Sequence, residues 1–136
     1  MSERTRVLAG GCRCGAVRYA VTDAFEYGAI CHCSECRKTT GSASKPFLGI
    51  AREQMRVVEG SDDIATFGDE EGHDARCARC GCFLFSVVRE GEYVHIAMGS
   101  LIDSPTMRPN HHIFVGSKAD WDKIRDGLPQ FDEYGH

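Results

Sequence analysis

The sequence predicts a mainly β domain, built from short antiparallel strands and held together by cysteine-bearing loops. Short segments rich in β-branched and aromatic residues recur along the chain, and each is bounded by glycine, aspartate, proline or serine. No long amphipathic helix competes with them, because helical signals are confined to one or two brief segments. A chain of 136 residues without a repeat or a low-complexity linker fits a single domain over residues 1–136.

An N-terminal hairpin is the first element expected. Residues 15–22 alternate Val17, Tyr19 and Val21 with alanine and arginine, which is the period of a half-buried strand. Residues 5–12 precede this segment and are its expected hairpin partner.

The clearest hairpin joins residues 82–88 to residues 92–101 through a turn that contains Gly91. Both segments are rich in β-branched and aromatic residues. Shorter strands are expected at residues 44–50, 55–60, 64–68 and 112–118.

Two short helices complete the expected elements. Ser34 is placed to cap a turn or two of helix over residues 35–40 that ends at Gly41. Residues 118–127 are compatible with a second helix that ends at Gly127.

Composition excludes several classes of protein. The net charge is -4 and the basic residues are dispersed, which argues against a nucleic-acid-binding surface. No run approaches the roughly 18 to 20 apolar residues of a membrane span, and the first residues lack the apolar block of a secretory signal. The expected location is the cytoplasm, with no membrane partner, while the sequence specifies no oligomeric state.

The cysteine content is unusual for such a chain. There are 8 cysteines, and they fall into three groups separated by long cysteine-free stretches. In a reducing compartment, grouped cysteines indicate metal binding or redox chemistry more often than disulfides. The pattern therefore favours a metal-binding protein.

The first and last groups predict a structural zinc site. Cys12 and Cys14 form one pair and Cys77 and Cys80 form another, and glycine follows both pairs. A structural zinc site usually takes two thiolates from each of two such turns. Disulfides or free core thiols are the alternative, but two pairs at ligand spacing favour a metal.

The middle group, Cys31, Cys33 and Cys36, offers three thiols to a second zinc. Three protein ligands with one open position are the pattern of a catalytic site. The adjacent Arg37 and Lys38 bring positive charge that could offset the thiolates and attract a carboxylate-bearing ligand. The alternative is that both are ordinary solvated charges.

The remaining candidates have weaker signals. Cys82 either closes the middle site or packs at the start of a strand, and the packing role is favoured. His32 is expected to point away from a metal held by its neighbours and to lie beside the site or in solvent. His111 and His112 could border a pocket, although loop histidines are more often exposed.

Four motifs, "GGCRCGAVRY", "CHCSECRKTTG", "RCARCG" and "KADWDKIRDGLPQFDEY", occur in this order. Together they resemble the glutathione-dependent formaldehyde-activating enzyme (GFA) family, also called the centromere protein V/GFA domain, over about residues 10–134. The resemblance implies a β-tent fold and two zinc ions per chain. It assigns a structural zinc to Cys12, Cys14, Cys77 and Cys80, and a catalytic zinc to Cys31, Cys33 and Cys36.

The resemblance also implies an activity. Family members form S-(hydroxymethyl)glutathione from glutathione and formaldehyde, a reaction classed with the carbon-sulfur lyases. The first hypothesis is therefore a zinc-dependent lyase or synthase with a small thiol such as glutathione as substrate. The alternatives are a non-enzymatic zinc domain that carries a thiol ligand or binds a protein, and a redox function of the middle cysteines.

Overall fold

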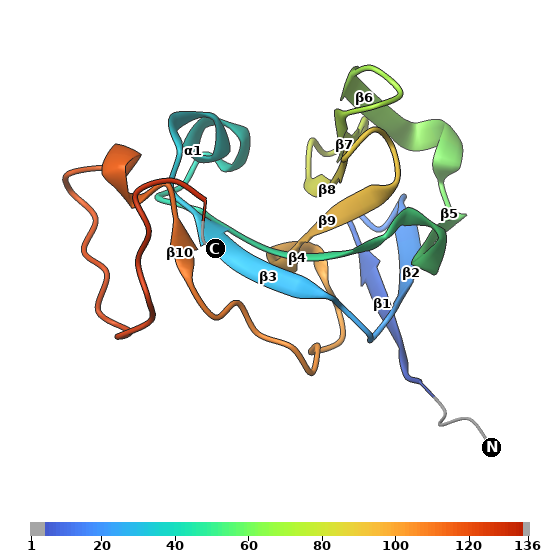
Figure 1. Ribbon diagram of the computed structural model, residues 1–136. Coiled ribbons are helices and arrows are strands. Elements are labelled where there is room, and N and C mark those ends of the chain that lie inside the picture. The colour runs from blue at the N-terminus through green and yellow to red at the C-terminus, as the bar shows by residue number, and fades with distance from the viewer. Residues whose placement is uncertain (1–4, 135–136) are drawn as a thin grey trace.

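The computed structural model describes residues 5–134 and is dominated by β-strands (Figure 1). The strands are β1 (Val7–Gly11), β2 (Arg18–Thr22), β3 (Tyr27–Cys31), β4 (Lys45–Ala51), β5 (Met55–Glu59), β6 (Ile64–Gly68), β7 (His73–Cys77), β8 (Phe83–Val88), β9 (Tyr93–Ala97) and β10 (His112–Ile113). Over the described range the α-helical content is one short helix, α1 (Ser34–Thr40). Short 3₁₀ turns occur at Arg52–Gln54, Ser61–Asp63, Met98–Ser100 and Val115–Ser117.

The strands form two sheets. A three-stranded sheet has the order β1-β2-β5, and a seven-stranded sheet has the order β10-β3-β4-β9-β8-β7-β6. Neighbouring strands are antiparallel except β10, which pairs parallel to β3. The predicted mainly β fold is confirmed, and both predicted hairpins are present as β1-β2 and β8-β9.

Residues from both sheets form the main hydrophobic core. Alternate positions of β2 contribute Tyr19 and Val21, as the sequence period predicts. Each large apolar side chain buried in this way stabilises the fold by about 1.5 to 3 kcal/mol. The fully buried members from the other strands include Leu8, Leu48, Ile50, Leu84, Val94 and Ile96.

The seven-stranded sheet carries a smaller apolar cluster of Ala29, Cys31, Phe47 and Ile113. Partly buried side chains that pack on it include Cys33 and Cys36 from the region of α1. In Figure 1, α1 and the β6–β8 region stand on the same side of β4, at opposite ends of the strand. The sheet therefore carries a cysteine-containing region away from the main core.

Helix α1 begins one residue earlier than the sequence indicates. The N-cap is Cys33, whose Sγ accepts a hydrogen bond from the Cys36 N–H at 3.3 Å, so the prediction that Ser34 caps the helix is wrong. The helix ends at Gly41, as predicted, where a φ of 67° favours glycine.

No helix in residues 5–134 is long and apolar enough to cross a membrane.

The C-terminal segment differs from its prediction. Residues 118–127 form turns and irregular backbone rather than a helix. Trp121, the largest apolar side chain of the segment, is 69% exposed and adds no packing that would stabilise a helix, and the Lys118 ammonium donates to the carbonyls of Ala119 and Asp122. The strand expected at residues 112–118 is limited to two residues, because Phe114 takes a left-handed conformation with φ 55°.

Gly49 on β4 allows the Tyr27 side chain to reach across that strand of the seven-stranded sheet. It pairs with Tyr27 on β3 and with His95 on β9. A Cβ at position 49 would overlap the Tyr27 ring, whose hydroxyl lies 2.7 Å from His95 Nε2. Glycine on β4, between β3 and β9, therefore makes room for the Tyr27–His95 hydrogen bond.

The Gly49→Ala substitution should lower the free energy of unfolding by about 1 to 3 kcal/mol, because the added methyl group displaces the Tyr27 ring. Gly99→Ala is the matched control, since a methyl group added there would meet no atom within 4 Å beyond its chain neighbours. Urea unfolding followed by circular dichroism measures both. Equal stability of the two variants would contradict the steric argument.

Candidate functional site

The first cysteine cluster joins two hairpins. Cys12 and Cys14 lie in the turn between β1 and β2, while Cys77 ends β7 and Cys80 lies in the turn before β8. Their sulfur atoms all lie within 4.8 Å of one another. The Cys12–Cys14 and Cys14–Cys77 Sγ separations are 3.6 and 3.7 Å.

These separations suit a tetrahedral thiolate centre. Metal–sulfur bonds of about 2.3 Å place the sulfur atoms of such a centre about 3.8 Å apart. Backbone N–H groups of Arg79 and Cys80 lie 3.4 Å from the Cys77 sulfur, and Val17 N–H donates to Cys12 Sγ at 3.2 Å. Backbone hydrogen bonds also lower the pKa of Cys80 to about 6, which favours the thiolate form that binds metals.

The second cluster lies where β3 meets α1. Cys31 ends β3, Cys33 caps the helix and Cys36 lies in its first turn, and the three sulfur atoms lie within 4.8 Å of one another. The hydrogen bond with Cys36 lowers the pKa of Cys31 to about 6, while the same contact raises the pKa of Cys36. Among residues 5–134, no fourth histidine, cysteine or carboxylate joins this cluster.

The second cluster opens into a cavity of about 570 Å³. This volume is within the range of small-molecule sites. Aromatic and aliphatic side chains form much of its wall, and polar groups come from β4, β7, β8 and β9. The lining residues other than the cysteines include Lys45, Phe47, Phe67, Asp74, Ser86, Val87, His95, Ile113, Phe114 and Tyr134.

A buried lysine faces the cavity beside the cysteines. Lys45 pairs with Cys31 across β3 and β4, and it is 8% exposed. Its Nζ donates to Ser86 Oγ at 3.3 Å, and the Ser86 hydroxyl donates to Asp74 Oδ1 at 2.6 Å. The ammonium also lies 5.2 Å from the Phe83 ring centroid. Its positive charge lowers the pKa of Cys31, after the larger effect of the Cys36 hydrogen bond.

A row of polar residues crosses the same sheet. Asp74, Ser86 and His95 are consecutive partners on β7, β8 and β9, and the row ends where His95 pairs with Gly49 on β4. The His95 ring stacks on Phe47 with 4.2 Å between centroids. Burial, reinforced by the charges of Lys45 and Arg89, lowers the pKa of His95 to about 3, so this imidazole is neutral at physiological pH.

The sequence reasoning missed Lys45, Asp74, Ser86 and His95. A usable signal was present for two of them, since Lys45 shares the alternation of Phe47 and His95 interrupts an apolar strand. Their meeting depends on the pairing of β7, β8, β9 and β4, which local patterns do not define.

The predicted anion-binding residues lie outside the cavity lining. Arg37 Nη2 donates to the Ser117 carbonyl at 3.3 Å, and Lys38 is exposed on α1. Neither residue lines the cavity beside the cysteines. Cys82 packs against the main core and lies near the first cluster, so it does not close the second.

His32 and His112 are both buried, which rules out the solvent alternative for His32 and the exposure expected for His112, while His112 does border a cavity. His32 Nε2 and His112 Nδ1 lie 2.8 Å apart, and His112 Nε2 lies 2.8 Å from Asp126. In the neutral form of both rings, His32 donates to His112 and His112 donates to Asp126. These two hydrogen bonds attach the C-terminal segment to the end of β3. They lie on the side of the backbone that His32 faces, away from the cysteine cluster. The sulfur cluster excludes His32, consistent with its predicted direction. His111 is half-exposed.

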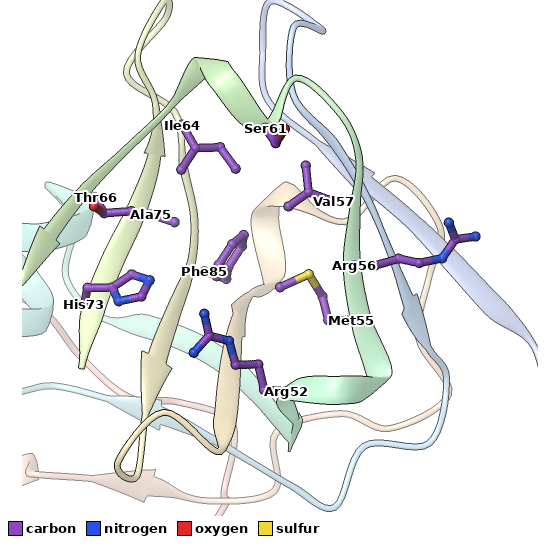
Figure 2. Close-up of a pocket in the computed structure, with 10 residues that line it drawn as sticks. All are labelled: Arg52, Met55, Arg56, Val57, Ser61, Ile64, Thr66, His73, Ala75 and Phe85. Carbon is purple, nitrogen blue, oxygen red and sulfur yellow. The ribbon is translucent and has the colours of Figure 1, made fainter. Parts of the chain in front are cut away.

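A second cavity, of about 340 Å³, lies between β5 and strands β6 to β8 (Figure 2). The side chains of Met55, Phe85 and Arg52 point into it, whereas Arg56 points away. No cysteine lines this cavity, in contrast to the first one.

The fold and the two clusters define a class of mainly β proteins whose cysteines can hold metal ions. A family model described as "Glutathione-dependent formaldehyde-activating enzyme" matches residues 7–117, and the chain belongs to this family. The predicted family is thus confirmed.

Two similar proteins agree with this assignment. A Halomonas elongata protein named "Putative glutathione-dependent formaldehyde-activating enzyme" is 33% identical over 128 residues, or 87% of this chain and 81% of that protein. The crystal structure of a Rhodobacter sphaeroides protein is 22% identical with a TM-score of 0.58, covering 91% of this chain and 99% of the other. The second likeness supports the fold.

The low pKa of His95 predicts a component of acid sensitivity. The unfolded chain binds a proton near the ordinary value of 6.5, whereas folded His95 resists protonation until about pH 3. The contribution of neutral His95 to the free energy of unfolding is therefore complete above pH 6.5. It is lost progressively as the pH falls toward 3, because the unfolded chain binds a proton that the folded chain does not. Between pH 7 and 5, His95 should account for about 2 kcal/mol of lost stability.

His95→Gln removes this titration while retaining groups that can hydrogen-bond to Tyr27, so the variant should lose about 2 kcal/mol less than the parent between pH 7 and 5. His111→Gln, in a half-exposed loop, is the control. Urea unfolding at both pH values gives the comparison. The same pH-dependent loss in the parent and His95→Gln would contradict the assignment.

Proposed function

We propose that the protein is a zinc-dependent carbon-sulfur lyase or synthase that adds a glutathione-type thiol to formaldehyde or a related small aldehyde. The observation that carries this proposal is the open cluster of Cys31, Cys33 and Cys36 at the edge of a cavity. Three converging thiols with no fourth protein ligand in the described chain leave one position for a substrate atom.

The two clusters suit different roles. The four sulfurs of Cys12, Cys14, Cys77 and Cys80 can complete a tetrahedral shell, which is typical of structural zinc. The second cluster fits three positions of such a shell. A zinc ion bound there would supply Lewis-acid chemistry and lower the pKa of an incoming thiol.

The residues of this chain position the reactants. The three cysteines orient the open position, and the walls of the cavity, including Phe47 and Ile113, limit access of water. A thiol and an aldehyde held in contact react faster because the entropic cost of bringing them together has been met on binding. The family description supplies glutathione as the proposed thiol and formaldehyde as the proposed carbonyl compound.

The activity predicts a catalysed rate of S-(hydroxymethyl)glutathione formation above the spontaneous rate. Cys33→Ser should reduce the catalysed component about 100-fold or more, because it removes a ligand of the reactive centre. Cys82→Ser should retain activity, since Cys82 lies outside the second cluster. Exchange spectroscopy by NMR measures the catalysed rate. A parent rate equal to the background would overturn the proposed function and favour a non-enzymatic zinc domain.

The metal assignment predicts two zinc ions per chain. Cys14→Ser should lose one zinc and about 3 kcal/mol or more of stability, because a metal bound only by the folded state adds its binding energy to folding. Cys14 is exposed, so this loss would not arise from core packing.

Cys36→Ser should lose the other zinc with a smaller change in stability. Native mass spectrometry and thermal unfolding measure both properties, with Cys82→Ser as the two-zinc control. Binding of both ions by Cys14→Ser and Cys36→Ser would contradict the assignment of the ligands.

A further inference from the structure

We propose that Lys45 binds the carbonyl oxygen of the aldehyde and stabilises the alkoxide formed when the thiol adds, an inference that rests on the proposed function. Lys45 and Cys31 are partners on adjacent strands and line the same cavity. This arrangement places an ammonium donor beside the cluster that would hold the attacking sulfur.

The hydrogen bonding of Lys45 leaves donor capacity for a ligand. An ammonium has three N–H donors, and Ser86 accepts one of them at 3.3 Å. The Ser86 hydroxyl directs its own proton to Asp74, which orients its oxygen lone pairs for Lys45. Asp74 and Ser86 therefore position the lysine.

The Lys45 ammonium is also buried without an ion pair to a carboxylate of the described residues. Within residues 5–134, no carboxylate lies within ion-pair distance of its ammonium, although the residue is 8% exposed. The rings of Phe47 and Phe83 lie 5.7 and 5.2 Å from Nζ. Rings at this range stabilise a cation and exclude water, which strengthens its interaction with an oxyanion.

The step requires no oxidant or reductant. The substrate thiol first releases its proton to solvent, and the sulfur lone pair forms a C–S bond with the carbonyl carbon. The C=O π electrons move to oxygen, where the Lys45 N–H groups stabilise the alkoxide. Solvent then returns one proton to oxygen, so thiol and aldehyde yield the hydroxyalkyl thioether without loss of atoms.

Lys45→Met tests the contribution because methionine retains an unbranched side chain without the charge or the N–H donors. The kcat for S-(hydroxymethyl)glutathione formation should fall about 100-fold or more, as on loss of an oxyanion donor, while the chain retains two zinc ions. Lys45→Arg should restore part of kcat. Lys123→Met is the matched control because Lys123 is exposed and lies outside this cavity.

Formate provides a readout that does not require turnover. Calorimetry should detect its binding to the zinc-loaded parent, with affinity about tenfold lower in Lys45→Met and unchanged in Lys123→Met. Ser86→Ala should weaken formate binding less than Lys45→Met, and it keeps the proposal testable if Lys45→Met does not fold.

Three results would overturn the inference. These are unchanged kcat in zinc-loaded Lys45→Met, loss of the second zinc with the lysine, or equal formate affinity in the parent, Lys45→Met and Ser86→Ala. An active parent with an equally active Lys45→Met would reject the lysine role alone. An inactive parent would reject the proposed function, while formate binding would still test the oxygen site.

Discussion

Successive side chains of a β-strand point to opposite faces of its sheet, and β4, β8 and β9 use both faces. Val94 and Ile96 of β9 lie in the main core, while His95 between them lines the cysteine cavity. Phe85 and Val87 likewise pack in the core on either side of Ser86. The same pairing register therefore builds the hydrophobic core and the polar site, and a one-residue slip would destroy both.

The cysteine clusters lie at different places in this framework. The first joins the turn after β1 to the end of β7, two segments far apart in sequence. The second is local, because Cys31, Cys33 and Cys36 occur on one strand end and one helical turn. The geometry of the second cluster therefore depends on β3 and α1, whereas its cavity depends on the whole seven-stranded sheet. This separation explains how one cluster suits a structural role and the other can remain open.

Much of the fold was predictable from local patterns. Alternation at Val17, Tyr19 and Val21 identified a strand correctly, and the spacing of the cysteines identified the members of both clusters. The Lys45 network was not predictable in this way, because its partners come from strands paired over long sequence separations. Burial of His112 was missed for a similar reason, since Asp126 reaches it from an irregular C-terminal segment. Local sequence patterns predict where a strand lies in the chain better than they predict which strands pair with it.

The charges that line the cavity beside the second cysteine cluster limit which substrate groups can enter it. Glu35 and Asp74 are acidic, and Lys45 is the lysine among its lining residues. Three thiolates around a divalent ion would add one net negative charge, equal in size to the charge of Lys45, so Glu35 and Asp74 would leave the cavity negative overall. A neutral aldehyde would fit this negative environment better than a negatively charged substrate group. For a glutathione-type substrate, the thiol end would reach the cysteines while its carboxylates remained in water, near the exposed rim residues Phe67 and Tyr134. The negative charge of the cavity would therefore keep the carboxylates of such a substrate outside while its uncharged thiol end enters.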